Sequence, residues 1–167
     1  MADGLPRLDV ALLPPGEFEL VWPIFDAVVA VGDTFAWPPG LGLEEARAAW
    51  AAPPARAYLA RLGGAVVGSY FLRPNQPGLG SHVANAGYMV APAARGRGIA
   101  RALCEHSLVE ARRLGFTAMQ FNFVVSTNLP AVRAWEACGF TVVGRVPGAF
   151  RHRTLGPVEV LVMHRFL

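Results

Sequence analysis

The hexapeptide Arg95-Gly96-Arg97-Gly98-Ile99-Ala100 decides the fold of this 167-residue chain. An apolar stretch that ends with Tyr88-Met89-Val90 precedes it, and a segment of helical periodicity follows it. The pattern predicts a strand, a glycine-rich turn and a helix N-terminus. In such an arrangement the backbone amides and the helix dipole bind anions, most often phosphate.

Composition indicates one folded domain over residues 1–167, because 53% of the residues are hydrophobic and only 16% are charged. No apolar run has membrane-spanning length and Met1 to Val10 lacks a signal-peptide core, so we expect a cytoplasmic protein without a membrane partner. The net charge of +3 is modest and no nucleic-acid docking motif is present, which argues against a nucleic-acid partner. Cys104 and Cys138 are predicted to be buried free thiols.

Periodicity and turn residues predict a chain in which helices and strands are mixed, and therefore an α/β domain with a single sheet. The predicted helices cover residues 16–31, 43–51, 98–114 and 128–139. The predicted strands cover residues 57–62, 65–72, 83–90, 117–125, 140–146 and 158–166. Residues 32–42, 73–81 and 147–157 are predicted loops.

Three phosphate-binding motifs compete for the hexapeptide. A nucleoside-triphosphate loop requires a Lys followed by Ser or Thr, and this chain has no lysine. A dinucleotide fingerprint requires a small residue where Arg101 stands and an acidic residue about 20 positions on, where none occurs. The third motif, Gln/Arg-x-x-Gly-x-Gly/Ala, is matched by Arg95, Gly98 and Ala100.

With this third motif, the segment from Gly87 to Phe140 resembles the acyl-CoA-binding core of the GCN5-related N-acetyltransferase superfamily. The matching parts are Met89-Val90, the hexapeptide, and Asn128 followed by Gly139-Phe140. The resemblance implies that superfamily's fold, a mixed sheet flanked by helices whose two central parallel strands splay apart. It also implies acetyl-CoA as the cosubstrate, with no metal.

The resemblance implies where acetyl-CoA binds. Backbone amides of the turn would hold the pyrophosphate, and the main chain of Met89-Val90 would pair with the pantetheine arm and polarise the thioester carbonyl. Asn128 would hydrogen-bond the arm. Trp135 stands where many members have a Tyr that protonates the thiolate, and indole cannot do so, which leaves another group or water. The implied cofactor-binding residues are Met89, Val90, Arg95, Gly96, Arg97, Gly98, Ile99, Ala100, Arg101, Asn128 and Trp135.

Asn85 and Asn122 each stand in the middle of an apolar predicted strand, where an amide is disfavoured. They either bridge two strands or line the groove where the strands part. Together with Arg73-Pro74-Asn75 and Thr127-Asn128, they resemble the azetidine-2-carboxylate N-acetyltransferase branch, in which asparagines bind the substrate's amine and carboxylate. On that resemblance we assign catalytic roles to Asn85 and Asn122.

Other polar residues are weaker candidates for the site. His82 begins the same predicted strand as Asn85, and Tyr88 should face away from Asn85 by strand alternation. Arg151 and His152 lie in the predicted 147–157 loop, which has the length of a lid.

The expected function is acetyl-CoA-dependent transfer to a small amine, an amino or imino acid or an analogue, by direct attack in a ternary complex. Two alternatives stay open: a protein or peptide N-acetyltransferase, and a non-catalytic CoA-binding regulatory module. Because terminal strands of this superfamily often build dimers, a homodimer is also an expectation.

Overall fold

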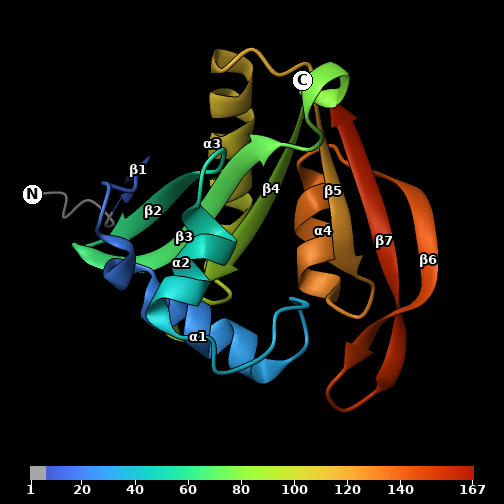
Figure 1. The fold of residues 1–167 in the computed structure, drawn as a ribbon, viewed down its shortest axis with the longest axis horizontal. Helices are drawn as coiled ribbons and strands as arrows, with labels where there is room; N and C mark the ends of the chain where they lie inside the picture. The colour runs from blue at the N-terminus through green and yellow to red at the C-terminus, as the bar shows by residue number, and fades with distance from the viewer. Residues whose placement is uncertain (1–6) are drawn as a thin grey trace, which may run out of the picture.

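The computed structural model describes residues 7–167 (Figure 1). Most of the Met1 to Val10 segment, on which the signal-peptide prediction rests, therefore lies outside the described residues. Within residues 7–167, seven strands form one sheet in the order β1-β2-β3-β4-β5-β7-β6. The strands are β1 (Leu8–Leu12), β2 (Arg56–Leu62), β3 (Ala65–Pro74), β4 (Val83–Val90), β5 (Ala118–Val125), β6 (Thr141–His152) and β7 (Gly156–Phe166). The α-helices are α1 (Trp22–Val31), α2 (Leu43–Ala51), α3 (Ile99–Arg113) and α4 (Leu129–Ala137).

The helices cover both faces of this sheet. One core joins α1 and α2 to side chains such as Phe71 and Met89, and a second core joins α3 and α4 to Tyr70 and the half-buried Tyr88. Successive side chains of a strand point to opposite faces, so strands buried on both faces need apolar residues at nearly every position. The predicted fold class, a single mixed sheet flanked by helices, is confirmed.

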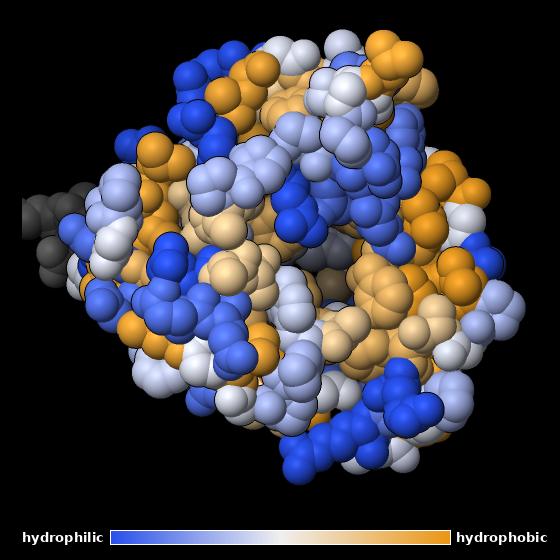
Figure 2. All heavy atoms as spheres, viewed as in Figure 1, coloured by the Kyte–Doolittle hydropathy of each residue, from blue (hydrophilic) through white to orange (hydrophobic). Residues whose placement is uncertain are grey.

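The sheet divides at its centre, between β4 and β5. These strands pair in parallel only through Val83 with Ala118 and Ala84 with Met119. Beyond Ala84 they separate, and α4 lies in the view of Figure 1 between the two strands. The predicted splaying of the central parallel strands is therefore confirmed, and Figure 2 shows the molecule hollowed near the middle of this face.

The predicted loop over residues 147–157 is wrong. β6 continues to His152 and β7 begins at Gly156, so a long hairpin replaces the loop. Pro147 is tolerated because it lies within a shift of the strand register between Val146 and Phe150, where the regular ladder is interrupted. The lid suggested by the loop's length is thus a paired hairpin.

The N-terminal region also differs from the prediction. The helix predicted over residues 16–31 begins only at Trp22, because Pro23 occupies the first turn, where a missing N–H is harmless. A short 3-10 turn at Phe18–Leu20 precedes it. The strand β1 was not predicted at all. Cys104 and Cys138 are free and buried, as expected, and no helix within residues 7–167 is long and apolar enough to cross a membrane.

Candidate active site

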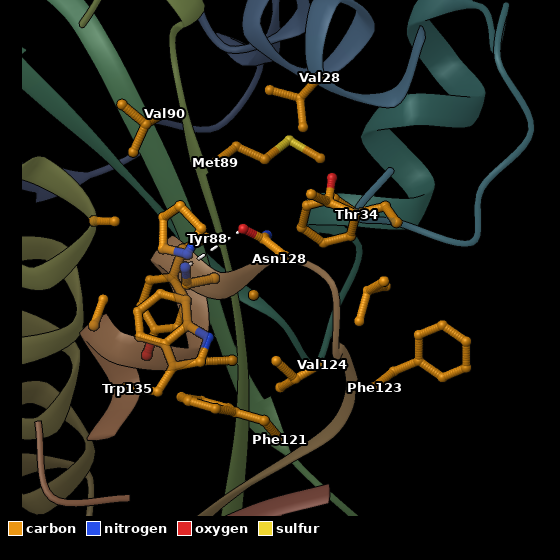
Figure 3. Close-up of a pocket in the computed structure, with 18 of the residues that line it drawn as sticks. Val28, Thr34, Tyr88, Met89, Val90, Phe121, Phe123, Val124, Asn128 and Trp135 are labelled. Carbon is orange, nitrogen blue, oxygen red and sulfur yellow. Dashed lines mark hydrogen bonds between the residues drawn. The ribbon is translucent and has the colours of Figure 1, made fainter. Parts of the chain in front are cut away.

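A groove of about 840 Å³ opens where β4 and β5 separate. Its walls come from α1, the α1–α2 loop, β3, β4, the start of α3, β5, α4 and the end of β6. In Figure 3, Thr34, Tyr88 and Asn128 face this space from three different elements. Of the residues that the sequence assigns to the site, all line the groove except Arg97, which is exposed outside it.

One end of the groove is the glycine-rich turn before α3. Gly96 and Gly98 have φ angles of +76° and +74°, and Gly98 is the N-cap of the helix. A Cβ atom at either glycine would meet no atom of the described residues within 4 Å, so side chains there would extend into the open space of the turn. Arg95 and Arg101 line the same end. Arg101 is paired with Glu105 over 2.8 Å, whereas Arg95 has no ion pair within the described residues. Open backbone, a helix N-terminus and the Arg95 guanidinium fit a pyrophosphate.

The strand edge that leads from this turn into the groove is unpaired. β4 pairs with β3 along its whole length, up to Val90 with Gly68, but with β5 only at its first two residues. The main chain around Met89 and Val90 therefore has no strand partner on the β5 side within the described residues. An extended arm such as pantetheine can add there as a strand does.

Three aromatic rings form the wall on the α4 side. Trp135 is buried, and its ring centroid lies 4.6 Å from that of Tyr88 and 5.4 Å from that of Phe121. The Tyr88 hydroxyl is 2.7 Å from Ser107 Oγ on α3, away from Asn85, as strand alternation predicts. Burial raises the pKa of Tyr88 well above its ordinary value, so the phenol stays protonated.

Four residues with amide side chains are linked by hydrogen bonds at the opposite end, which we call the acceptor end. Asn85 Nδ2 donates to the main-chain carbonyl of Gln120 over 2.9 Å, and the side-chain Nε2 of Gln120 donates to Asn122 Oδ1 over 3.0 Å. Asn122 Nδ2 in turn donates to Asn75 Oδ1 over 2.6 Å. Asn85 thus bridges β4 and β5 and also lines the groove, so the two alternatives drawn from the sequence hold together.

Sequence reasoning missed much of this second end. Asp33, Thr34, Phe35 and Trp37 line it from the α1–α2 loop, and Phe71 and Arg73 line it from β3. The only signal for the loop was its concentration of aromatic and polar residues between glycines and prolines. Phe71 and Arg73 reach the groove because β3 pairs with β4, which places Phe71 opposite Gly87 and Arg73 opposite Asn85.

His152 also lines the groove, whereas Arg151 does not. The main-chain N–H groups of Thr154 and Leu155 both donate to His152 Nδ1, over 3.2 Å and 3.3 Å. A neutral His152 ring with an accepting Nδ1 carries its proton on Nε2. This side chain therefore presents a donor and not a base through Nε2. His82, the other histidine candidate, is exposed and does not line the groove.

No group of three or more His, Cys, Asp or Glu side chains that could hold a metal ion occurs in the described part of the chain. A curated relative, N-acetyltransferase aca1 of Schizosaccharomyces pombe, is 40% identical over 86 residues, which make up 52% of this chain. The match spans only 41% of that relative's length.

Solved structures resemble the whole fold. A GCN5-related N-acetyltransferase from Kribbella flavida has 46% identity and a TM-score of 0.90, covering 96% of this chain and 98% of that chain. A phosphinothricin acetyltransferase from Sinorhizobium meliloti in complex with acetyl-CoA shares the fold at 17% identity, with a TM-score of 0.84 over 96% of this chain and 88% of that one. The family model described as "Acetyltransferase (GNAT) family" matches residues 18–140. Because that match extends over more than half of the sequence, the chain belongs to the acetyltransferase (GNAT) family.

Proposed function

We propose that the protein transfers the acetyl group of acetyl-CoA to the amino group of a small amino or imino acid, in a ternary complex. The bound ammonium group loses a proton to solvent, and the neutral amine then attacks the thioester directly as the CoA thiolate leaves. The observation that carries the proposal is a single groove that joins an anion-binding turn at the start of α3 to a polar end on β4 and β5. The relatives named as N-acetyltransferases, at 40% and 46% identity, support transfer to nitrogen.

The end of the groove at the start of α3 binds acetyl-CoA and polarises its thioester carbonyl. Bound acetyl-CoA supplies the acetyl thioester. The backbone N–H groups from Arg95 to Arg101 and the positive end of α3 hold the pyrophosphate. Because the Ala91 N–H bonds to Val67 on β3, strand alternation directs the Met89 N–H to β3 as well and leaves the Val90 N–H on the open side. The main-chain N–H of Val90 donates to the thioester carbonyl oxygen and stabilises the negative charge that develops there.

At the acceptor end, the neutral side-chain amides of Asn85 and Asn122 bind the substrate that receives the acetyl group. Asn85 donates one N–H to the Gln120 main chain, so its Oδ1 and its other N–H are free for a ligand. Asn122 is linked to the same residue, because it accepts from the Gln120 side chain. A carboxamide can accept from an amine and donate to a carboxylate, and both groups occur in an amino acid. Small zwitterions therefore suit this end of the groove.

Protonation of the leaving thiolate falls to solvent. Trp135 has no acidic proton, and Tyr88, the nearest phenol, is bonded to Ser107 and has a raised pKa, which makes it a weaker acid. A thiol is acidic enough for its thiolate to leave before it is protonated.

A protein or peptide acceptor fits the groove less well. Arg153, at the tip of the β6–β7 hairpin, donates from its main chain to the Gly32 carbonyl over 3.1 Å and from Nη1 to the Ala30 carbonyl over 2.8 Å. These bonds join the hairpin to the end of α1. An extended peptide needs an open trough, whereas this contact ties two of the elements that wall the groove to each other.

The test is the release of free thiol from acetyl-CoA in the presence of amino acids, proline analogues, polyamines, aminoglycosides and short peptides. Turnover with small amino or imino acids is the expected result. Turnover with peptides alone would favour the protein acetyltransferase. CoA binding without turnover of any amine would leave the non-catalytic module as the function.

A further inference from the structure

The loop between α1 and α2 presents two buried oxygens at the acceptor end of the groove. Asp33 Oδ1 and Thr34 Oγ1 are both buried, and neither has a hydrogen-bond partner among the described residues. Both residues line the groove, and Figure 3 shows Thr34 on the side of the pocket opposite Trp135. Buried polar atoms in folded proteins are nearly always satisfied. Two unsatisfied oxygens on adjacent groove-lining residues are therefore suited to N–H or O–H donors of a ligand, which they reach when their side chains turn toward the groove.

The charges that face the groove are separated along it. Arg95 and Arg101 stand at the pyrophosphate end, whereas Arg73 stands at the acceptor end beside its strand partner Asn85. Asp33 is the one carboxylate among the described residues that line the groove. No ion pair within residues 7–167 involves Asp33 or Arg73.

The acceptor end therefore shows one anionic and one cationic group that do not neutralise each other. The Arg73 guanidinium lies 4.8 Å from the centroid of the Phe71 ring, which also lines the groove. A ligand with both an ammonium and a carboxylate matches this pair of charges. A polyamine, which carries only positive charge, does not.

The residues on both sides of Asp33 hold the backbone of the loop in place without a ligand. Gly32, the preceding residue, ends α1 in the left-handed conformation with a φ of 70°, and Arg153 donates to its carbonyl. On the other side of Asp33, the ring of Phe35 stacks on Trp37 at a centroid distance of 5.1 Å and an interplanar angle of 9°. A loop whose backbone is ordered before binding loses less entropy when its ligand arrives.

Building on the proposed function, we propose that Asp33 binds the ammonium group of the acceptor and makes the enzyme selective for amino and imino acids. Thr34 Oγ1 accepts a second N–H from the same group. Arg73 and the amide network take the carboxylate at the other side of the acceptor. Asp33 is thus a specificity-determining residue that touches the substrate's nitrogen.

The experiment compares two ligands that differ at the nitrogen alone. L-azetidine-2-carboxylate carries a ring ammonium, and oxetane-2-carboxylate has a ring oxygen in its place. Each is titrated calorimetrically into the full chain saturated with CoA, using the wild type, Asp33→Asn, Asp33→Glu and the control Asp26→Asn. Asp26 is exposed on α1 and does not line the groove.

In the wild type and in Asp26→Asn, the ammonium ligand should bind about 10- to 100-fold more tightly than its oxygen analogue, as expected for a charge-assisted hydrogen bond. Asp33→Asn should abolish most of that difference without changing the affinity for CoA, and Asp33→Glu should restore part of it. Equal loss of affinity for both ligands, an unchanged preference in Asp33→Asn, or failure of the wild type to bind either ligand would overturn the proposal.

The same variants separate this proposal from the proposed function. If no amine causes thiol release but the expected ligand preference is observed, the proposed catalytic function is wrong and the role of Asp33 in binding stands. Turnover of azetidine-2-carboxylate by Asp33→Asn with an unchanged KM would keep catalysis and remove the role of Asp33.

Discussion

Asn85 donates from Nδ2 to the main-chain carbonyl of Gln120 over 2.9 Å, directly after the last parallel pair between β4 and β5. A side chain therefore makes the contact between the two strands at the point where the regular ladder stops. Asn85 is buried, so its amide could not exchange this partner for water in the folded protein without local opening. The bond fixes the closed end of the groove.

Replacement of Asn85 by alanine should destabilise the fold as well as impair acceptor binding. The Gln120 carbonyl would lose its donor, and an unsatisfied buried acceptor costs about 1–3 kcal/mol. Urea denaturation of Asn85→Ala should show a loss of that size in the free energy of unfolding. Stability equal to that of the wild type would mean that the bond does not hold the strands.

Asn122 offers the matched contrast, because its side chain is exposed although it bonds to both Gln120 and Asn75. Asn122→Ala should change the free energy of unfolding by less than about 1 kcal/mol, as is usual for surface positions. Steady-state assays should show a KM for the acceptor raised by about tenfold, the effect of one lost hydrogen bond to a charged group, with the KM for acetyl-CoA unchanged. An unaltered acceptor KM would remove Asn122 from the substrate site.

The sequence was sufficient for the elements whose pattern is local. β4 and α2 have the predicted bounds, because a short apolar run and a helix flanked by Gly42 and Pro53 are visible within a short window. The anion-binding turn was found for the same reason, since its glycines and its helix are adjacent in the chain.

The missed features depend on contacts between distant residues. β1 is a strand because Leu8–Leu12 pairs with β2, about fifty residues away. The hairpin is joined to α1 by the bond from Arg153 to the Ala30 carbonyl, across a sequence separation of 123 residues. No local pattern shows that Asp33 faces the same groove as Asn85, because tertiary packing alone brings the loop and the strand together.

Gly98→Ala should weaken CoA binding because the added methyl group occupies space expected for the pyrophosphate, an effect distinct from the backbone strain that it also causes. Gly98 has a φ of +74°, and an added Cβ would meet only open space, which the pyrophosphate is expected to share. An alanine in the left-handed conformation costs about 1–2 kcal/mol of stability wherever it occurs. Calorimetry should show CoA affinity reduced by about tenfold, the equivalent of roughly one lost hydrogen bond.

Gly16→Ala is the control for Gly98→Ala. Gly16 has a φ of +83° with nothing within 4 Å of the added Cβ among the described residues, and it does not line the groove. It should lose a similar amount of stability and bind CoA as the wild type does. Equal CoA affinity in the two variants would show that the turn does not contact the cofactor.

His106 should make the protein less stable in mild acid. Its Nδ1 lies 2.8 Å from the Tyr70 hydroxyl, and burial lowers the pKa of the imidazole below its ordinary value of 6.5. As the pH falls through 6.5, the unfolded chain takes up this proton before the folded one does. The free energy of unfolding therefore decreases until the pH reaches the lower folded-state pKa. Glu110, whose pKa is lowered mainly by its hydrogen bond with Arg113, contributes stability that is lost only in a more acidic range, below about 4.5.

Urea denaturation at a series of pH values between 7 and 5 tests this assignment. His106→Gln keeps an acceptor for the Tyr70 hydroxyl but has no imidazole, so its stability should decline less steeply over this range than that of the wild type. His82→Gln, which removes an exposed histidine, serves as the control. Parallel pH profiles for His106→Gln and the wild type would show that His106 does not resist protonation in the folded state, and that other groups cause the loss of stability.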